Sequence, residues 1–108
     1  MTKISIVKSN GKYKGFECIG HSGYAVAGED IVCAAISTLT INTINSIEQF
    51  TEDAFNLEAD EKTGMIKMYF RDAPTNNATL LMDSMVLGLN AIADQYDERF
   101  VTVKIQEV

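Results

Sequence analysis

The feature that most constrains the fold is an amphipathic run from Ile31 to about Phe50. Its apolar residues recur at spacings of three and four, which predicts a helix with one apolar face. The run is rich in isoleucine and threonine, whose branched side chains weaken the intrinsic helix preference. Tertiary packing must therefore hold this helix, and a second layer must cover its apolar face. The residues expected on that face are Val32, Ala35, Ile36, Leu39, Ile47 and Phe50.

Two strand pairs can supply the second layer. The segments KISIV and YKGFECIG read as strands on either side of Ser9-Asn10-Gly11-Lys12, in which Asn-Gly is a favoured hairpin signal. Apolar and polar residues then alternate over residues 55–70 around the turn Lys62-Thr63-Gly64, which predicts a second hairpin. Its alternating apolar residues are Phe55, Leu57, Ala59, Ile66, Met68 and Phe70.

A second helix and a final strand complete the order. Ala73-Pro74 breaks the chain, and Thr75-Asn76-Asn77 supplies capping residues for a helix. Residues 99–108, RFVTVKIQEV, alternate as a strand. Leu81, Met85, Leu89, Ile92 and Tyr96 are expected on the buried helix face, and Val101, Val103 and Ile105 on the inward strand face with Thr102, Lys104 and Gln106 outward.

The order β-β-α-β-β-α-β predicts an α+β fold. We expect a two-layer sandwich of a mostly antiparallel or mixed five-stranded sheet and two helices. The order of the strands within the sheet does not follow from the sequence. With 108 residues, 46% hydrophobic content and one proline, the chain is expected to form a single domain, residues 1–108.

Charge and composition exclude several classes of function. The net charge of -6 works against direct binding of nucleic acid or of an anionic membrane, and a basic partner is easier to accommodate. The apolar run at the start of the chain is too short for a signal peptide, so we expect a cytoplasmic protein. The two cysteines are then expected as free thiols, and no cysteine-histidine pattern points to a strong metal site.

The stretch GHSGYAVAGEDIVCAAIS, residues 20–37, holds the single histidine, His21, and the cysteine Cys33. Asp30 is the natural N-cap of the first helix, which makes Cys33 its third residue, where the helix dipole and free N–H groups favour a thiolate. His21 could then act as a base towards Cys33 and later as an acid. The Asp30 carboxylate would oppose a thiolate unless it faced the imidazole. A structural reading, in which Cys33 is a small core residue, stays open.

The glycines Gly20, Gly23 and Gly28 strengthen the functional reading, because they are costly in chain entropy and suit close approach to a ligand. They would also suit a tight crossover. Ser37 lies one turn beyond Cys33 on the same side of the helix and is either a site hydroxyl or a small packing residue.

Cys18 raises a metal alternative, since Cys18 and His21 have the spacing of half a site that Cys33 and Asp30 could complete. In an unbroken strand, however, residues three apart point to opposite faces, so we expect Cys18 in the core. Four further apolar residues could line a pocket but are expected in the core: Phe16, Tyr24, Met85 and Leu89.

The residues Gly20-His21-Ser22-Gly23-Tyr24, followed by Gly28-x-Asp30-Ile31-Val32-Cys33-Ala34-Ala35-Ile36-Ser37, resemble the motif of the ribosomal-processing cysteine protease (Prp) family. The resemblance in length and element order covers the whole chain. It implies that His21 and Cys33 form a catalytic dyad, that Gly20, Ser22, Gly23, Asp30 and Ser37 support the site or bind substrate, and that the glycine loop moves to admit substrate.

The resemblance also implies a homodimer without metal or organic cofactor. The implied substrate is the basic precursor of large-subunit ribosomal protein number twenty-seven, whose short N-terminal extension is removed by a cut after an aromatic residue. Two other classes remain: a non-catalytic ribosome-assembly or protein-interaction module, and a thiol-redox protein that would use Cys18 as the resolving thiol.

Overall fold

The described part of the chain folds into the predicted order of elements. The computed structural model describes residues 2–20, 29–60, 62–96, 98 and 100–108, without the side chains of Glu29 and Asp30. The elements are β1 (Thr2–Ser9), β2 (Lys12–Ile19), α1 (Glu29–Phe50), β3 (Phe55–Asp60), β4 (Met65–Phe70), α2 (Asn76–Gln95) and β5 (Val101–Glu107).

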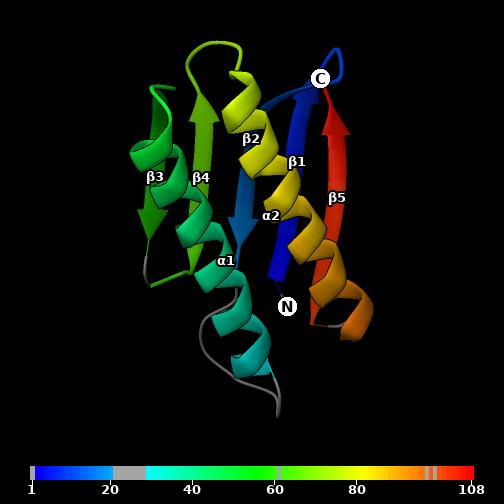
Figure 1. Cartoon of the computed structure of the whole chain (residues 1–108). Coiled ribbons are helices and arrows are strands. Elements are labelled where there is room, and N and C mark those ends of the chain that lie inside the picture. Colours follow the sequence, from blue (N-terminus) through cyan, green and yellow to red (C-terminus); the bar gives the residue numbers. More distant parts are fainter. Residues whose placement is uncertain (1, 21–28, 61, 97, 99) are drawn as a thin grey trace.

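The five strands form one mixed sheet in the order β3-β4-β2-β1-β5 (Figure 1). The pairs β1–β2, β2–β4 and β3–β4 are antiparallel, whereas β1 and β5 are parallel. Parallel neighbours need a long connection between them, and almost the whole chain separates these two strands. The expected mixed sheet is therefore confirmed, with β2 at its centre between β4 and β1.

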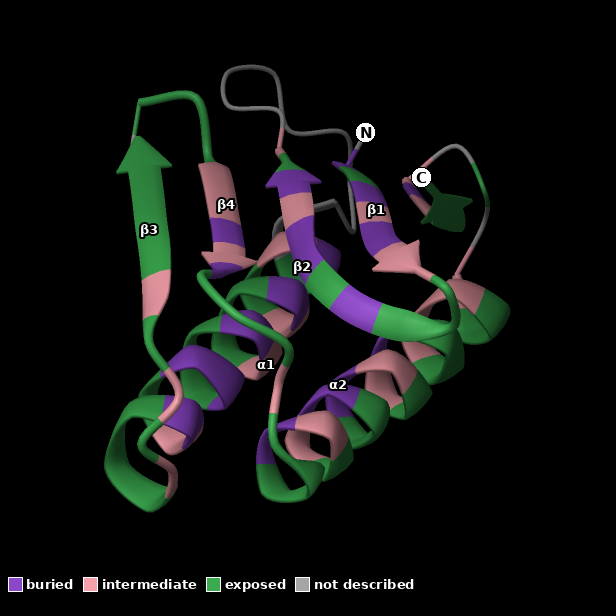
Figure 2. Cartoon of the chain, turned by 90° about the horizontal axis from the view of Figure 1, so that it is seen from above, coloured by how far each residue is buried: buried purple, intermediate pink, exposed green. Residues whose placement is uncertain are grey.

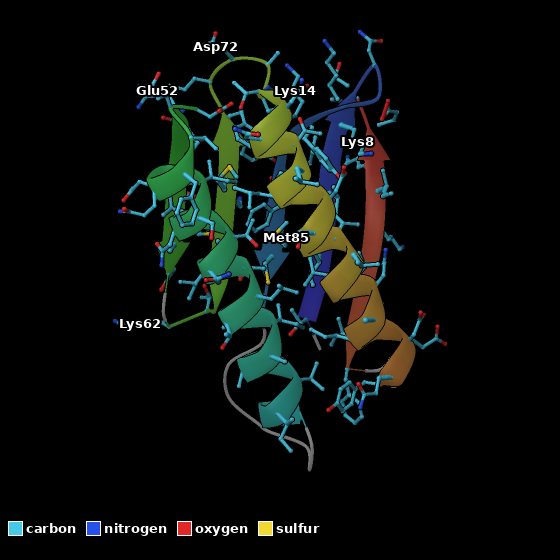
Figure 3. All side chains as sticks on the ribbon, in the orientation of Figure 1. Lys8, Lys14, Glu52, Lys62, Asp72 and Met85 are labelled. Carbon is cyan, nitrogen blue, oxygen red and sulfur yellow. The ribbon has the colours of Figure 1, made fainter. Side chains whose placement is uncertain are left out.

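Both helices cover the same face of the sheet, and in the described part of the chain no helix lies on the opposite face (Figure 2). Ile4, Ile6 and Phe16 point from the central strands into the layer between sheet and helices, where they are buried. Met85 and Leu89 of α2 are fully buried there too, so their expected place in the core is confirmed. Figure 3 shows Met85 between α1 and α2, in front of the central strands.

Helix α1 is sustained by this packing. Among the described helices, α1 alone contains a segment, Ile31–Phe50, long and apolar enough in composition to cross a membrane. In the structure Val32, Ile36 and Ile47 are buried against the sheet. This burial accounts for part of its apolar composition, whereas Ile31 and Ile41 stay exposed.

Two residues expected on buried faces are exposed instead. Phe50 is 74% exposed and Ile105 is 60% exposed. Phe50 is the last residue of α1, and Ile105 lies near the end of the edge strand β5. The helical and strand periods place Phe50 and Ile105 on the same face as the buried residues of their elements. At these two ends, however, no other described part of the chain covers that face.

Local turn and cap chemistry appears as the sequence predicts. Asn10 and Gly11 have φ values of 53° and 77°, the left-handed pair that a two-residue hairpin turn requires. Thr75 is the N-cap of α2, and its side chain accepts a hydrogen bond from the Ala78 amide. Asp53, which follows α1, accepts hydrogen bonds from the Thr75 amide and hydroxyl and so ties the two helices together at this end.

Gly15 of β2 lies close against the backbone of β4. A Cβ atom at this position of β2 would lie 2.1 Å from the Met68 carbonyl oxygen and 2.8 Å from the Tyr69 Cα atom of β4. Both atoms belong to backbone that the sheet holds in place. Gly88 of α2 is different, because its Cβ would meet only the flexible end of the Leu39 side chain, at 2.6 Å.

Substituting Gly15 by alanine should therefore lower the free energy of unfolding by about 3 kcal/mol or more, because the β2–β4 pairing must open to admit the methyl group. Urea denaturation measures this loss. Gly88→Ala is the matched control and should stay within about 1 kcal/mol of wild type, because the gain in helix preference offsets the movement of Leu39. Equal losses for the two variants would contradict the close approach of β2 and β4.

Candidate active site

Helix α1 starts at the end of the sheet where β1 begins (Figure 1). Cys33 of this helix lies at the same end, because its thiol contacts Thr2, the first residue of β1. The helix begins at Glu29, two residues before the predicted start, so the prediction that Asp30 is the N-cap is wrong. Acidic residues are favoured inside the first turn as well as at the cap, because their charge complements the positive end of the helix dipole. Cys33 is thus the fifth helical residue, and in a regular helix its amide is already used by the backbone ladder.

A threonine that sequence reasoning did not single out contacts the Cys33 thiol. The Oγ1 atom of Thr2 and the Sγ atom of Cys33 lie 3.5 Å apart and share a hydrogen bond. Thr2 is buried, and its amide donates to the Phe100 carbonyl oxygen, which fixes the start of β1. When the sulfur is a thiolate, the Thr2 hydroxyl can donate to it and stabilise the negative charge.

Cys18 is a buried core residue, as the strand alternation predicts. It is 4% exposed and packs in the layer between sheet and helices. Burial raises the pKa of the Cys18 thiol to about 11, and repulsion from a neighbouring Cys33 thiolate adds to the shift. Both cysteines are free thiols. Cys33 is only partly buried, so it is the more accessible of the two.

Gly20 follows the last residue of β2 and precedes the glycine-rich segment of residues 21–28 in the sequence. Its amide donates to the Gly64 carbonyl oxygen at 3.3 Å, and a Cβ atom at Gly20 would lie 3.1 Å from the same oxygen. Gly64 has a φ of 71°, a left-handed conformation that glycine adopts without strain. The turn between β3 and β4 therefore anchors the end of β2, a contact that the sequence analysis did not predict.

The strand register brings Gly20 and Cys33 to the same end of the sheet. β1 and β2 pair as far as Lys3 and Ile19, so the preceding Thr2 and the following Gly20 both lie at that end. Thr2 contacts Cys33, and His21 is bonded to Gly20. The described backbone thus brings the attachment point of the histidine to the same end as the cysteine.

Four of the expected site features lie outside the described residues: His21, Ser22, Gly23 and the side chain of Asp30. The role of each remains a prediction from the sequence, and so does that of Tyr24. Within the described ranges, no three histidine, cysteine, aspartate or glutamate side chains are grouped so that they could hold a metal ion.

Ser37 is exposed and lines a groove of about 380 Å³ between α1 and the β3–β4 hairpin. We call this the hairpin groove and define it by Ser37, Ile41 and Ile44 of α1, Leu57 and Ala59 of β3, and Ile66 of β4. Gly64, which contacts Gly20, lines it as well. The groove therefore begins beside Gly20 and one helical turn from Cys33.

Sequence reasoning missed the groove. The signal available was that Ile41 and Ile44 are apolar but fall outside the stripe of α1 predicted to face the sheet. In the structure Ile44 is buried, whereas Ile41 is 47% exposed and Leu57 is 51% exposed. A surplus of apolar residues beyond those that one sheet face can cover is thus a marker for such a groove.

The chain matches a known family over nearly its whole length. Residues 1–101 match the family model described as cysteine protease Prp. The ribosomal processing cysteine protease Prp of Staphylococcus aureus is 30% identical over 94 residues, 85% of this chain and 87% of that protein. The Prp of Bacillus subtilis is 26% identical over 111 residues, 97% of this chain and 99% of that protein.

Solved structures have the same fold. A crystal structure of a Streptococcus mutans protein superposes with a TM-score of 0.85 at 30% identity, covering 100% of this chain and 96% of that one. The S. aureus protease Prp in complex with a substrate peptide superposes with a TM-score of 0.91 at 22% identity, covering 98% and 100%. The five-stranded mixed sheet with two helices is therefore the fold of these proteins.

The different surroundings of the two thiols predict selective alkylation. Iodoacetamide at pH 8 should modify Cys33 and spare Cys18, because a thiol with a pKa near 11 is almost entirely protonated at that pH and is shielded by the core. Peptide mapping by mass spectrometry identifies the modified residue. The Cys33→Ala variant should react only after denaturation, and rapid labelling of Cys18 in the native variant would contradict its burial.

Proposed function

The chain belongs to the cysteine protease Prp family, and we propose on this basis that it is a thiol endopeptidase that uses Cys33 as its nucleophile. The observation that carries the proposal is the position of Cys33, partly exposed, at the end of the sheet where Gly20 opens the histidine-bearing loop. The family match supplies the class of reaction.

In the proposed reaction the Cys33 sulfur attacks the scissile carbonyl carbon and forms a tetrahedral oxyanion. The carbon–nitrogen bond then breaks, the amine leaves with a proton, and the acyl segment stays on Cys33 as a thioester. Water hydrolyses the thioester and regenerates the thiol. The Thr2 hydroxyl is placed to donate to the sulfur while it carries negative charge.

His21 is the proposed proton carrier. It takes the proton of the Cys33 thiol as a base, gives a proton to the leaving amine as an acid, and activates the water of the second step. Because the amide of Cys33 takes part in the helix ladder, we assign the oxyanion to earlier amides, from the first turn of α1 or from the glycine loop.

The proposed substrate is the precursor of large-subunit ribosomal protein number twenty-seven, cut after an aromatic residue of its N-terminal extension. The curated relatives are named as ribosomal processing proteases, which supports a ribosomal protein as the substrate. A net charge of -6 would attract such a basic protein over a distance. Ser22, Gly23, Asp30 and Ser37 are proposed to support the site or to contact this substrate.

We further propose that the enzyme acts in the cytoplasm as a homodimer. Ribosomal proteins are made and assembled in that compartment, so the substrate sets the location. The family resemblance is the support for the dimer. Sedimentation of the purified protein tests it directly, and a monomer at micromolar concentration would contradict it.

Incubation of the extended precursor with purified protein tests the proposed activity. Mass spectrometry should detect one defined cut near the N-terminus of the precursor, and the Cys33→Ala variant should lower the rate at least about a thousandfold, because no other group replaces the sulfur. His21→Ala should also abolish most of the activity.

Cys33→Ser separates a protease from a non-catalytic binding module. A protease variant should bind the precursor and fail to turn it over, whereas a binding module would show no cleavage with wild type and unchanged binding with the variant. A folded wild-type protein that binds the precursor without cutting it would overturn the proposed activity.

A further inference from the structure

The hairpin groove leaves large aliphatic side chains open to solvent. Ile41 of α1 and Leu57 of β3 both line it and are about half exposed. Ala59, further along β3, is exposed as well. The hairpin lies at the edge of the sheet, where α1 leaves β3 incompletely covered (Figures 1 and 2). An apolar recess of about 380 Å³ therefore persists in the folded chain.

The helix wall of the groove continues from the proposed nucleophile. Cys33, Ser37, Ile41 and Asn45 follow one another at intervals of four residues, and the last three line the groove. Each interval advances about 6 Å along the helix axis. An extended peptide repeats its side-chain direction every two residues, about 6.7 Å. Alternate side chains of a peptide bound at Cys33 can thus stay in step with successive helical turns.

The walls also define the chemistry of the occupant. No charged residue occurs in α1 from Ile31 to Ile47, so this wall offers only alkyl, hydroxyl and amide groups. The lining acid Asp60 sits beside the β3–β4 turn and accepts a hydrogen bond from the Lys62 amide. Figure 3 shows Lys62 at the outer end of this turn. The recess between is suited to uncharged, apolar side chains.

We propose that the hairpin groove binds an extended, apolar segment of the substrate adjacent to the scissile bond, with Ile41 and Leu57 as the residues that determine specificity. The inference rests on the proposed function, since it takes Cys33 as the point of cleavage. Ser37 and Asn45 offer polar groups to the backbone of the segment, while alternate side chains enter the apolar recess. The other side chains of the segment face away from the groove.

Shortening a side chain that lines the groove tests the proposed substrate contact directly. The probe is a fluorescein-labelled peptide of the precursor's N-terminal extension, and its affinity for the uncleaving Cys33→Ser protein is measured by fluorescence anisotropy. Adding Leu57→Ala should weaken binding about tenfold, a loss of about 1.4 kcal/mol. Leu80→Ala is the matched control, because Leu80 is an exposed leucine of α2 outside the groove, and it should leave the affinity unchanged.

Filling the groove gives a second, independent test. Ala59→Phe places a large ring in the recess and should weaken binding at least tenfold. Glu58→Phe puts the same ring on the opposite face of β3, because neighbouring strand residues alternate, and should have no effect. Both positions are exposed, so neither change disturbs the core.

Peptide variants complete a double-mutant cycle. Each apolar residue of the probe is replaced by alanine in turn, and at one position at least the effects of peptide and Leu57→Ala substitutions should be strongly non-additive. Additive effects at every apolar position would overturn the proposed contact.

The outcomes separate this inference from the proposed function. If wild type cleaves the precursor but Leu57→Ala and Ala59→Phe cleave and bind normally, the groove is not the substrate site and the protease stands. If binding depends on Leu57 but wild type never cleaves, the groove binds the extension without a scissile bond beside it, and the protease falls. If Leu57→Ala instead changes only the monomer–dimer equilibrium, a second copy occupies the groove and the inference is wrong.

Discussion

The packing of α1 on the sheet is the interaction on which the rest of the structure depends. The helix is built from branched side chains that do not favour a helix in isolation, and Val32, Ile36 and Ile47 stabilise it by burial against the strands. That packing positions the helix axis over the sheet. It also determines which residues of α1 remain available for chemistry, because it leaves Cys33 partly exposed and Ser37 and Ile41 exposed.

The same helix thus serves as core element, carrier of the proposed nucleophile and wall of the proposed substrate groove. A thiol on a packed helix has a well-defined position, and its proposed partner His21 lies in the glycine-rich segment that precedes this helix in the sequence. Such an arrangement suits a protease with narrow specificity. The packed helix would present the nucleophile, and the residues beside the helix would select the substrate. The Gly20–Gly64 contact joins the two parts, since it ties the first residue of the loop motif to the hairpin that forms the other wall of the groove.

Local chemistry in the sequence predicts much of this structure. The element order, the Asn10-Gly11 turn and the Thr75 cap each depend on residues close together in the chain, and all are confirmed. Strand order and the parallel β1–β5 pair depend on contacts between distant segments, which periodicity does not encode. The exposure of Phe50 and Ile105 belongs to the same class, because it depends on where a neighbouring layer ends.

The residues of the candidate site also fall into two groups, those that local sequence predicts and those that depend on contacts between distant segments. Cys33 and Ser37 could be selected from the sequence because their spacing places them on one side of a helix. Thr2 and Gly64 could not, since each reaches the site only through strand pairing and turn geometry. The predicted start of the helix at Ile31 is two residues too late. An acidic residue such as Asp30 stabilises the first helical turn from more than one position, so it does not mark the cap uniquely.

Detection of the acyl-enzyme tests the central claim, that Cys33 is the nucleophile of a peptidase. Wild-type protein is mixed with the extended precursor, quenched in acid within the first turnover and analysed by intact mass and peptide mapping. The account predicts a species heavier than the protein by the N-terminal fragment less one water, with the added mass on the peptide that contains Cys33. Cleavage that proceeds without this species and persists in Cys33→Ala would contradict it.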